Sequence, residues 1–133
     1  MTTSGYSGTP LIKKLGIKEG MKIRLINQPD NYFLLLGADI SHQLSSNNVP
    51  DLVHLFVTEK KTLQSLFHAL IPELPKTTVI WISWYKKSAK MPTDITEDSI
   101  REIVLPTGWV DIKVCAVSEL WSGLKIVFRK SSK

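Results

Sequence analysis

The fold is decided by two apolar runs, LVHLFV at residues 52–57 and VIWISW at residues 79–84. Nearly unbroken runs of this kind, rich in β-branched and aromatic side chains, are typical of strands buried on both faces of a parallel sheet. Between the two runs, apolar side chains recur at the spacing of one helix face, at Leu63, Leu66, Phe67 and Leu70. The stretch therefore predicts a strand–helix–strand unit, in which Thr58 caps the helix and Pro72 ends it.

Shorter elements are predicted before this unit. A helix is expected from Pro10 to Gly16, because Thr9 suits a helix cap, proline suits a first helical position and glycine suits a left-handed end. Apolar and basic side chains alternate in Met21–Ile26, which predicts a strand with one solvent-facing side. A second short helix is predicted over Pro29–Leu36.

The last third of the chain predicts a helix and a hairpin. Thr96 suits the cap of a helix at Glu97–Leu105, whose acidic first turn complements the helix dipole. Alternating patterns at Val110–Val117 and Leu124–Phe128, separated by a turn, predict an antiparallel pair. The element order predicts an α/β fold, a single three-layer Rossmann-like domain with a mostly parallel five-stranded sheet and an antiparallel C-terminal hairpin.

The composition limits the class of protein. The chain has 133 residues, of which 43% are hydrophobic, and this suits one domain over residues 1–133. Residues 1–8 are expected to form a flexible N-terminal arm, and residues 37–50 a surface loop. A single cysteine excludes a disulfide-held secreted module. Neither a signal peptide nor a membrane-spanning apolar stretch is recognisable, so we expect a cytoplasmic protein without a membrane partner.

The sequence lacks the usual phosphate-binding loop. The segment after the first predicted strand, INQPDNY at residues 26–32, has no glycine, and Pro29 has no N–H to offer an anion. No cofactor is therefore predicted. The three histidines lack ligand spacing, so no metal site is predicted, and His54 and Cys115 are interpreted as core residues. No catalytic residue is assigned.

Candidate ligand-binding residues follow from the geometry of parallel sheets, which bind ligands beyond the carboxyl ends of their strands. Aromatic side chains beside lysines add to them, because such groups stack on bases and neutralise phosphates. The candidates are Asn27, Thr58, Trp84, Lys86, Lys87, Asp94 and Trp121. Together with a formal net charge of +5, the aromatic and basic members allow a nucleic acid as a partner.

Several motifs between Tyr6 and Arg129 resemble a small bacterial family known as a domain of unknown function, namely YSGTPLIKKLGIKEG, DLVHLFVT, WISWYKK, PTDITEDSIREI and KVCAVSELWSGLKIVFRK. More distantly, the chain is similar to the second half of class I methyltransferases, which depend on S-adenosylmethionine. This resemblance implies the sheet order 1-2-3-5-4, with the last strand antiparallel and the first strand at an edge. Lys22 and Arg24 would then discourage unwanted pairing at that edge.

Three functions are consistent with these residues. The favoured one is a module that binds a small ligand or a protein partner and is no catalyst, because no phosphate loop, metal set or nucleophile–base pair is recognisable. The alternative is a divergent methyltransferase-like enzyme that depends on S-adenosylmethionine, with Asn27, Thr58, Lys86 and Asp94 around its cleft. The third is a nucleic-acid-binding protein.

Overall fold

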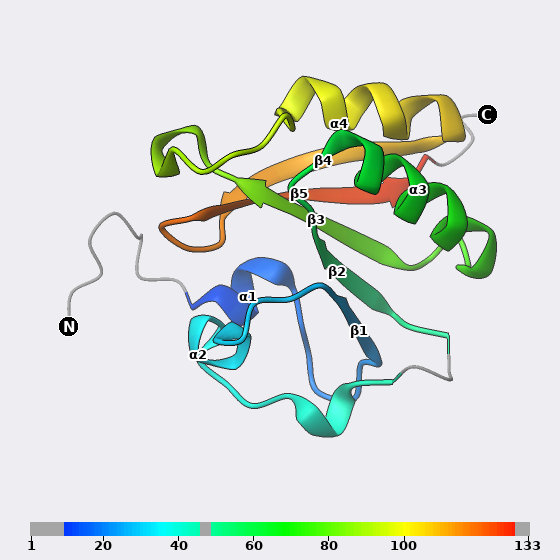
Figure 1. Cartoon of the computed structure of the whole chain (residues 1–133). Coiled ribbons are helices and arrows are strands. Elements are labelled where there is room, and N and C mark those ends of the chain that lie inside the picture. Colours follow the sequence, from blue (N-terminus) through cyan, green and yellow to red (C-terminus); the bar gives the residue numbers. More distant parts are fainter. Residues whose placement is uncertain (1–9, 46–48, 130–133) are drawn as a thin grey trace.

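The structure is a computed structural model, and it describes residues 10–45 and 49–129. The described residues form a single α/β domain in three layers, with a central sheet between two layers of helices (Figure 1). The predicted cap Thr9 and the predicted arm at residues 1–8 lie outside the described residues. Within the described ranges, no helix is long and apolar enough to cross a membrane.

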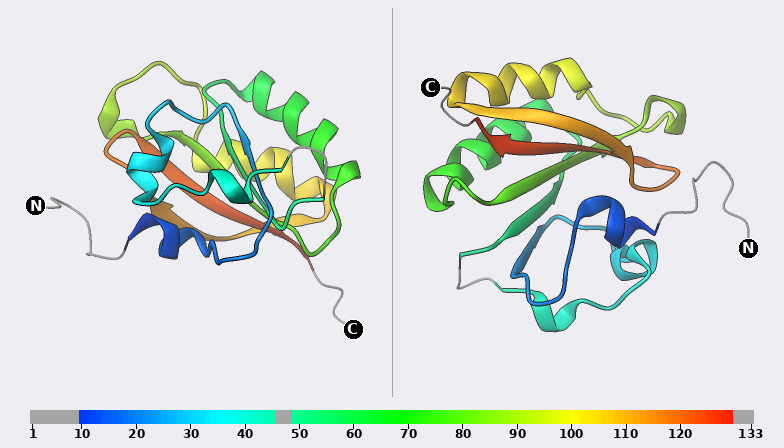
Figure 2. Two further views of the ribbon diagram at one scale, coloured as in Figure 1. Left: turned by 90° about the horizontal axis from the view of Figure 1, so that it is seen from below. Right: turned by 180° about the vertical axis from the view of Figure 1, so that it is seen from behind.

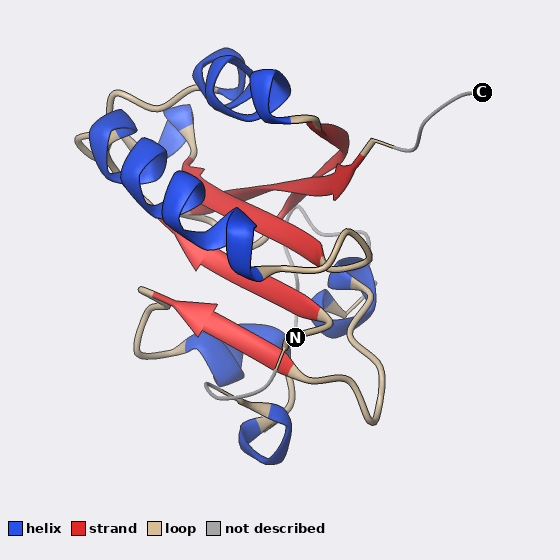
Figure 3. Cartoon of the chain, turned by 90° about the vertical axis from the view of Figure 1, so that its right-hand side faces the viewer, coloured by secondary structure: helices blue, strands red, loops and turns tan. Residues whose placement is uncertain are grey.

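The sheet has five strands in the order β1-β2-β3-β5-β4, as the resemblance to class I methyltransferases implies. They are β1 (Ile23–Ile26), β2 (Leu52–Phe56), β3 (Val79–Tyr85), β4 (Trp109–Ala116) and β5 (Trp121–Phe128). The first three strands are parallel (Figure 3), and β5 pairs antiparallel with both β3 and β4. The strand β1 lies at an edge, as expected, and its outer side carries one isolated bridge, from Ile23 to Leu44.

Four α-helices cover the two faces of the sheet. They are α1 (Leu11–Leu15), α2 (Tyr32–Leu36), α3 (Lys60–Leu70) and α4 (Glu97–Val104). The helices α3 and α4 cover one face, and α1 and α2 cover the other (Figures 1 and 2). Short 3-10 turns occur at Ser41–Gln43, Ile71–Glu73, Lys87–Ala89 and Leu105–Thr107, the first of them inside the segment predicted as a loop.

Each face of the sheet has its own apolar core. Alternate side chains of β2 point to opposite faces, so Val53 and Leu55 pack under α3 and α4 while Leu52 and Phe56 pack against α1 and α2. The central strand β3 follows the same rule, and Trp81 lies fully buried on the side of α1 and α2. Because both faces are covered, the strands β2 and β3 are nearly unbroken apolar runs, interrupted only by His54 and Ser83.

The start of α3 differs from the prediction. The cap residue is Glu59 rather than Thr58, and its side chain makes no capping hydrogen bond. Instead, the Lys60 backbone N–H donates to the Asp94 carboxylate at 2.7 Å, across 34 residues of sequence. The prediction of Thr58 as the cap is wrong, because a remote loop supplies the acceptor that a local side chain would otherwise provide.

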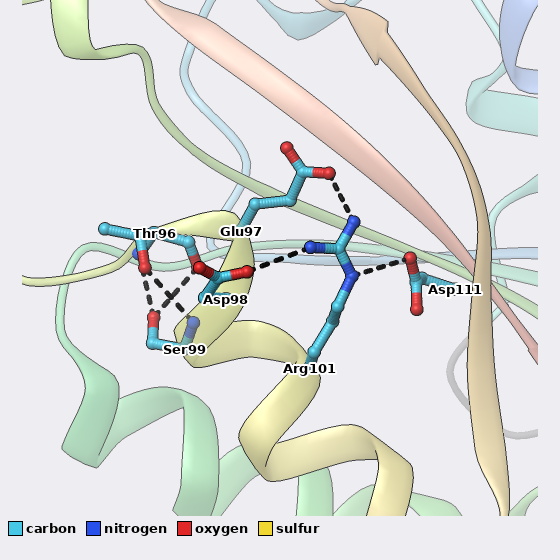
Figure 4. A network of polar contacts seen from close by, with 6 residues as sticks. All are labelled: Thr96, Glu97, Asp98, Ser99, Arg101 and Asp111. Atoms are coloured by element: carbon cyan, nitrogen blue, oxygen red, sulfur yellow. Dashed lines mark hydrogen bonds and ion pairs between the residues drawn. The ribbon is translucent and has the colours of Figure 1, made fainter.

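The start of α4 follows its local sequence. The Ser99 backbone N–H donates to the Thr96 hydroxyl at 3.1 Å, and the Thr96 N–H donates to the Ser99 hydroxyl at 2.8 Å. Figure 4 shows this capping box beside the Arg101 guanidinium, which contacts the carboxylates of Glu97, Asp98 and Asp111. The Asp111 contact ties α4 to β4, so three acids of this region have structural partners.

Substituting Thr96 tests the contribution of this cap. We expect Thr96→Ala to lower the free energy of unfolding by about 1 kcal/mol, because the Ser99 N–H loses its acceptor. Urea denaturation of the variant measures the change. Thr62→Ala serves as the control, since Thr62 lies in the first turn of α3 and only contacts the exposed Glu59 at 3.5 Å. Equal losses in both variants would contradict the role of the cap.

Candidate functional site

The turn after β1 is where a nucleotide-binding fold usually holds its ligand. Here the turn contains no glycine, and Asn27 adopts the left-handed conformation with φ of 58°. The helix that follows, α2, has only five residues. A cavity of about 230 Å³ lies beside the turn, lined in part by Gln28 and Asp30. This volume falls below the range of about 300–1,000 Å³ that is typical of ligand sites.

A larger cleft lies beyond the carboxyl ends of β2 and β3. Its volume is about 760 Å³, within the range of small-molecule sites. The lining residues come from the end of β2, the first turn of α3, the end of β3 and the loop before α4, namely Thr58, Glu59, Lys61, Tyr85, Met91, Pro92, Thr93 and Asp94. The cleft therefore sits where open parallel sheets bind ligands.

Two hydrogen bonds hold the loop before α4 against the start of α3. The Thr93 hydroxyl donates to the Thr58 carbonyl at 2.7 Å, and the Lys60 N–H donates to Asp94 Oδ1 at 2.7 Å. Thr93 also accepts from the Ile95 N–H at 3.1 Å, and the Ile95 side chain is buried in the core under α3 and α4. These contacts fix the wall of the cleft to the rigid part of the domain.

The structure brings two of the candidate residues together. Thr58 and Asp94 both line the cleft. Lys86 and Lys87 follow Tyr85 directly, at the start of the loop that ends in the cleft wall, with Lys86 half-buried and Lys87 exposed. Asn27 is exposed at the end of the edge strand and is not a lining residue of the cleft.

The two tryptophan candidates lie elsewhere. Trp84 is 7% exposed and packs in the core under α3 and α4. Trp121 is 9% exposed, stacks on Tyr85 with ring centroids 4.3 Å apart, and lines a second cavity of about 370 Å³ between α2 and the β4–β5 turn. Tyr85 thus lines the main cleft and stacks on Trp121, which lines the second cavity.

Sequence reasoning missed several lining residues. Lys61, Met91, Pro92 and Thr93 were not among the candidates. The rule of strand ends does point to Glu59 and Tyr85, which directly follow Thr58 and Trp84. Met91 and Thr93 come from a loop that returns to α3, and only the fold shows that return.

A buried polar cluster lies under α2, on the face opposite α3. His54 is fully buried and contacts the Tyr32 hydroxyl through Nδ1 at 2.8 Å and the Ser83 hydroxyl through Nε2 at 2.7 Å. Burial lowers the pKa of His54 to about 3 and raises the pKa of Tyr32. The interpretation of His54 as a hydrogen-bonded core histidine is confirmed, and at neutral pH all three side chains are uncharged.

Cys115 and the histidines offer no evident reactive centre. Cys115 is half-buried on β4, and burial raises the pKa of its thiol, which disfavours the reactive thiolate. In the part of the chain that the structure describes, no three His, Cys, Asp or Glu side chains gather in a way that could hold a metal ion.

Comparison with known proteins gives likeness in fold alone. No protein-family model matches the chain, and no curated protein matches its sequence. Among solved structures, an S-adenosylmethionine-dependent methyltransferase from Aquifex aeolicus is 14% identical, with a TM-score of 0.60 over 89% of this chain and 87% of that one. A ribosomal protein L11 methylase from Lactobacillus delbrueckii is 13% identical, with a TM-score of 0.58 over 90% and 76%.

A third similar structure is described as a protein of the NADB-Rossmann superfamily from Streptococcus agalactiae. It is 7% identical, with a TM-score of 0.60, and the match covers 100% of this chain and 72% of that one. These neighbours confirm the Rossmann-like, methyltransferase-like fold. They contradict the favoured prediction of a non-catalytic binding module, because the methyltransferases among them agree better with the alternative of a divergent methyltransferase-like enzyme.

The side chains of the cleft fit the chemical groups of S-adenosylmethionine. The carboxylates of Glu59 and Asp94 are acceptors for ribose hydroxyls and offset the positive charge of a sulfonium. The Tyr85 ring and the apolar surfaces of Met91 and Pro92 suit a flat base or an S-methyl group. The turn after β1 does not offer the usual nucleoside-binding loop, because it lacks glycine and Pro29 has no N–H to donate.

Proposed function

We propose that the protein is a divergent methyltransferase whose S-adenosylmethionine site is the cleft beyond β2 and β3. The observation that carries the proposal is the cleft of about 760 Å³ at the carboxyl ends of the two buried parallel strands, with two carboxylates and an aromatic ring in its lining. The methyltransferase fold of the solved neighbours supports it.

Each lining residue has a distinct task in this proposal. Glu59 and Asp94 bind the ribose hydroxyls and complement the cationic end of the donor, while Tyr85 and Met91 contact its flat and apolar parts. Bound there, the donor supplies an electrophilic methyl group. The Thr93–Thr58 hydrogen bond keeps the cleft wall in position, so the protein loses little conformational freedom on binding.

The proposal is tested by the thermal stability of the protein with S-adenosylmethionine and with S-adenosylhomocysteine. At a ligand concentration about 100 times the dissociation constant, a single site stabilises the folded state by roughly 2.7 kcal/mol. We expect a clear rise in melting temperature with either ligand. In Glu59→Gln, the dissociation constant should be at least tenfold weaker, which is a loss of about 1.4 kcal/mol of binding free energy.

The control variant is Glu102→Gln. Glu102 is exposed on α4 and does not line the cleft, and this change removes the same charge as Glu59→Gln. We expect it to bind both ligands as the unmodified chain does. Absence of any shift at millimolar ligand would reject the proposal, and so would equal weakening by the two variants.

A further inference from the structure

The first turn of α3 opens into the cleft with its positive end towards the Asp94 carboxylate. The turn contains no acidic residue of its own, and Lys60 and Lys61 occupy its first positions. The Lys60 N–H donates to Asp94 Oδ1 at 2.7 Å. A carboxylate at this place is favourable, because the partial positive charge of the helix end and the unpaired backbone N–H groups both attract an anion.

In many nucleotide-binding folds, a ligand phosphate occupies the corresponding place at a helix start. Here a side chain of the protein itself occupies it. A phosphate that approached α3 would have to displace Asp94 and would also meet Glu59, which lines the same cleft. Among the lining residues, Glu59 and Asp94 are acidic and only Lys61 is basic, so the lining itself carries net negative charge and disfavours anions.

We propose that Asp94 determines the ligand class of the cleft, by excluding nucleoside phosphates and other polyanions and admitting a nucleoside that carries positive charge. This inference rests on the proposed function and adds a residue that sets its specificity. Asp94 acts both by occupying the helix start and by its charge. Asp94→Asn separates the two effects, because the amide oxygen can still accept from the Lys60 N–H while the charge is gone.

The experiment measures dissociation constants for S-adenosylmethionine and for ADP at low ionic strength, in the unmodified chain, in Asp94→Asn and in Asp94→Glu. We expect the unmodified chain to prefer S-adenosylmethionine. In Asp94→Asn, the dissociation constant for ADP divided by that for S-adenosylmethionine should fall at least about tenfold. Asp94→Glu keeps the charge and should keep the preference. Salt should weaken the discrimination, because the effect is electrostatic.

The outcomes separate this inference from the proposed function. If the unmodified chain binds S-adenosylmethionine and Asp94→Asn leaves the ratio unchanged, Asp94 neither selects the ligand class nor complements the cationic end of the donor, and only the location of the proposed site stands. If the unmodified chain binds no S-adenosylmethionine, the proposed function fails. A competition assay with the unmodified chain needs no variant, so it tests the exclusion of nucleoside phosphates even if Asp94→Asn does not fold. Displacement of bound S-adenosylmethionine by ADP at equal concentration would overturn the inference.

Discussion

Acidification from about pH 7 to about pH 4 is expected to lower the free energy of unfolding by about 3 kcal/mol through His54 alone. Burial lowers the pKa of His54 from its ordinary value of 6.5 to about 3 in the folded protein. At pH values between about 3 and 6.5, His54 binds a proton in the unfolded chain but stays neutral in the folded protein. The stability that neutral His54 contributes is therefore present at neutral pH and is lost as the pH falls below 6.5, down to about 3.

Urea denaturation at a series of pH values measures this effect. His54→Gln removes the titrating ring, so its stability should depend less on pH over the same interval, even though the variant is less stable overall. His68→Gln is the matched control, because it removes an exposed histidine from α3 and leaves the buried ring of His54 in place. If all three proteins lose stability in parallel, the buried ring is not the cause.

Trp81→Ala is expected to lower the free energy of unfolding by about 3–5 kcal/mol. Trp81 is fully buried on β3, and its indole N–H donates to the Leu15 carbonyl at 2.9 Å, which ties α1 to the centre of the sheet. The change leaves a large cavity and an unpaired carbonyl at the end of α1. Thermal or chemical denaturation measures the loss.

Trp81→Phe divides this effect into its two parts. The phenyl ring keeps most of the apolar contact but has no N–H, so we expect a smaller loss of about 1–3 kcal/mol. Val114→Ala serves as the surface control, because Val114 is 51% exposed on the edge strand β4 and should change stability by less than about 0.5 kcal/mol. A Trp81→Ala variant no less stable than this control would refute the packing role.

The elements of the sheet were predictable because their signals are local or directly adjacent, whereas the order of the strands followed from the resemblance to class I methyltransferases. The nearly unbroken apolar runs of β2 and β3 require cover on both faces, and the helix between them has one apolar stripe. Thr96 begins α4 and Gly16 ends α1, as their residue types predict, and Gly16 adopts the left-handed conformation with φ of 79°. Each of these features depends on residues a few positions apart.

The packing around Gly123, in the motif WSGLK at residues 121–125, could not be predicted from a local pattern. A Cβ atom at Gly123 would lie 3.0 Å from Val117 Cγ2 and 3.3 Å from Trp81 Cε3. The glycine therefore leaves room for two side chains from other strands and turns. Trp121, which the sequence marked as a candidate for binding, packs edge-on against Phe56, stacks on Tyr85 and lines the cavity of about 370 Å³.

By itself the sequence determined the helices and strands and the absence of glycine from the turn after β1, because periodicity, caps and turns act over short distances. The tertiary structure alone decided which residues line the cleft. It brings Asp94 to the start of α3 across 34 residues, sets Thr93 against Thr58, and buries Trp84 away from the cleft. Such contacts depend on how a loop returns to a helix, and no local pattern encodes that path.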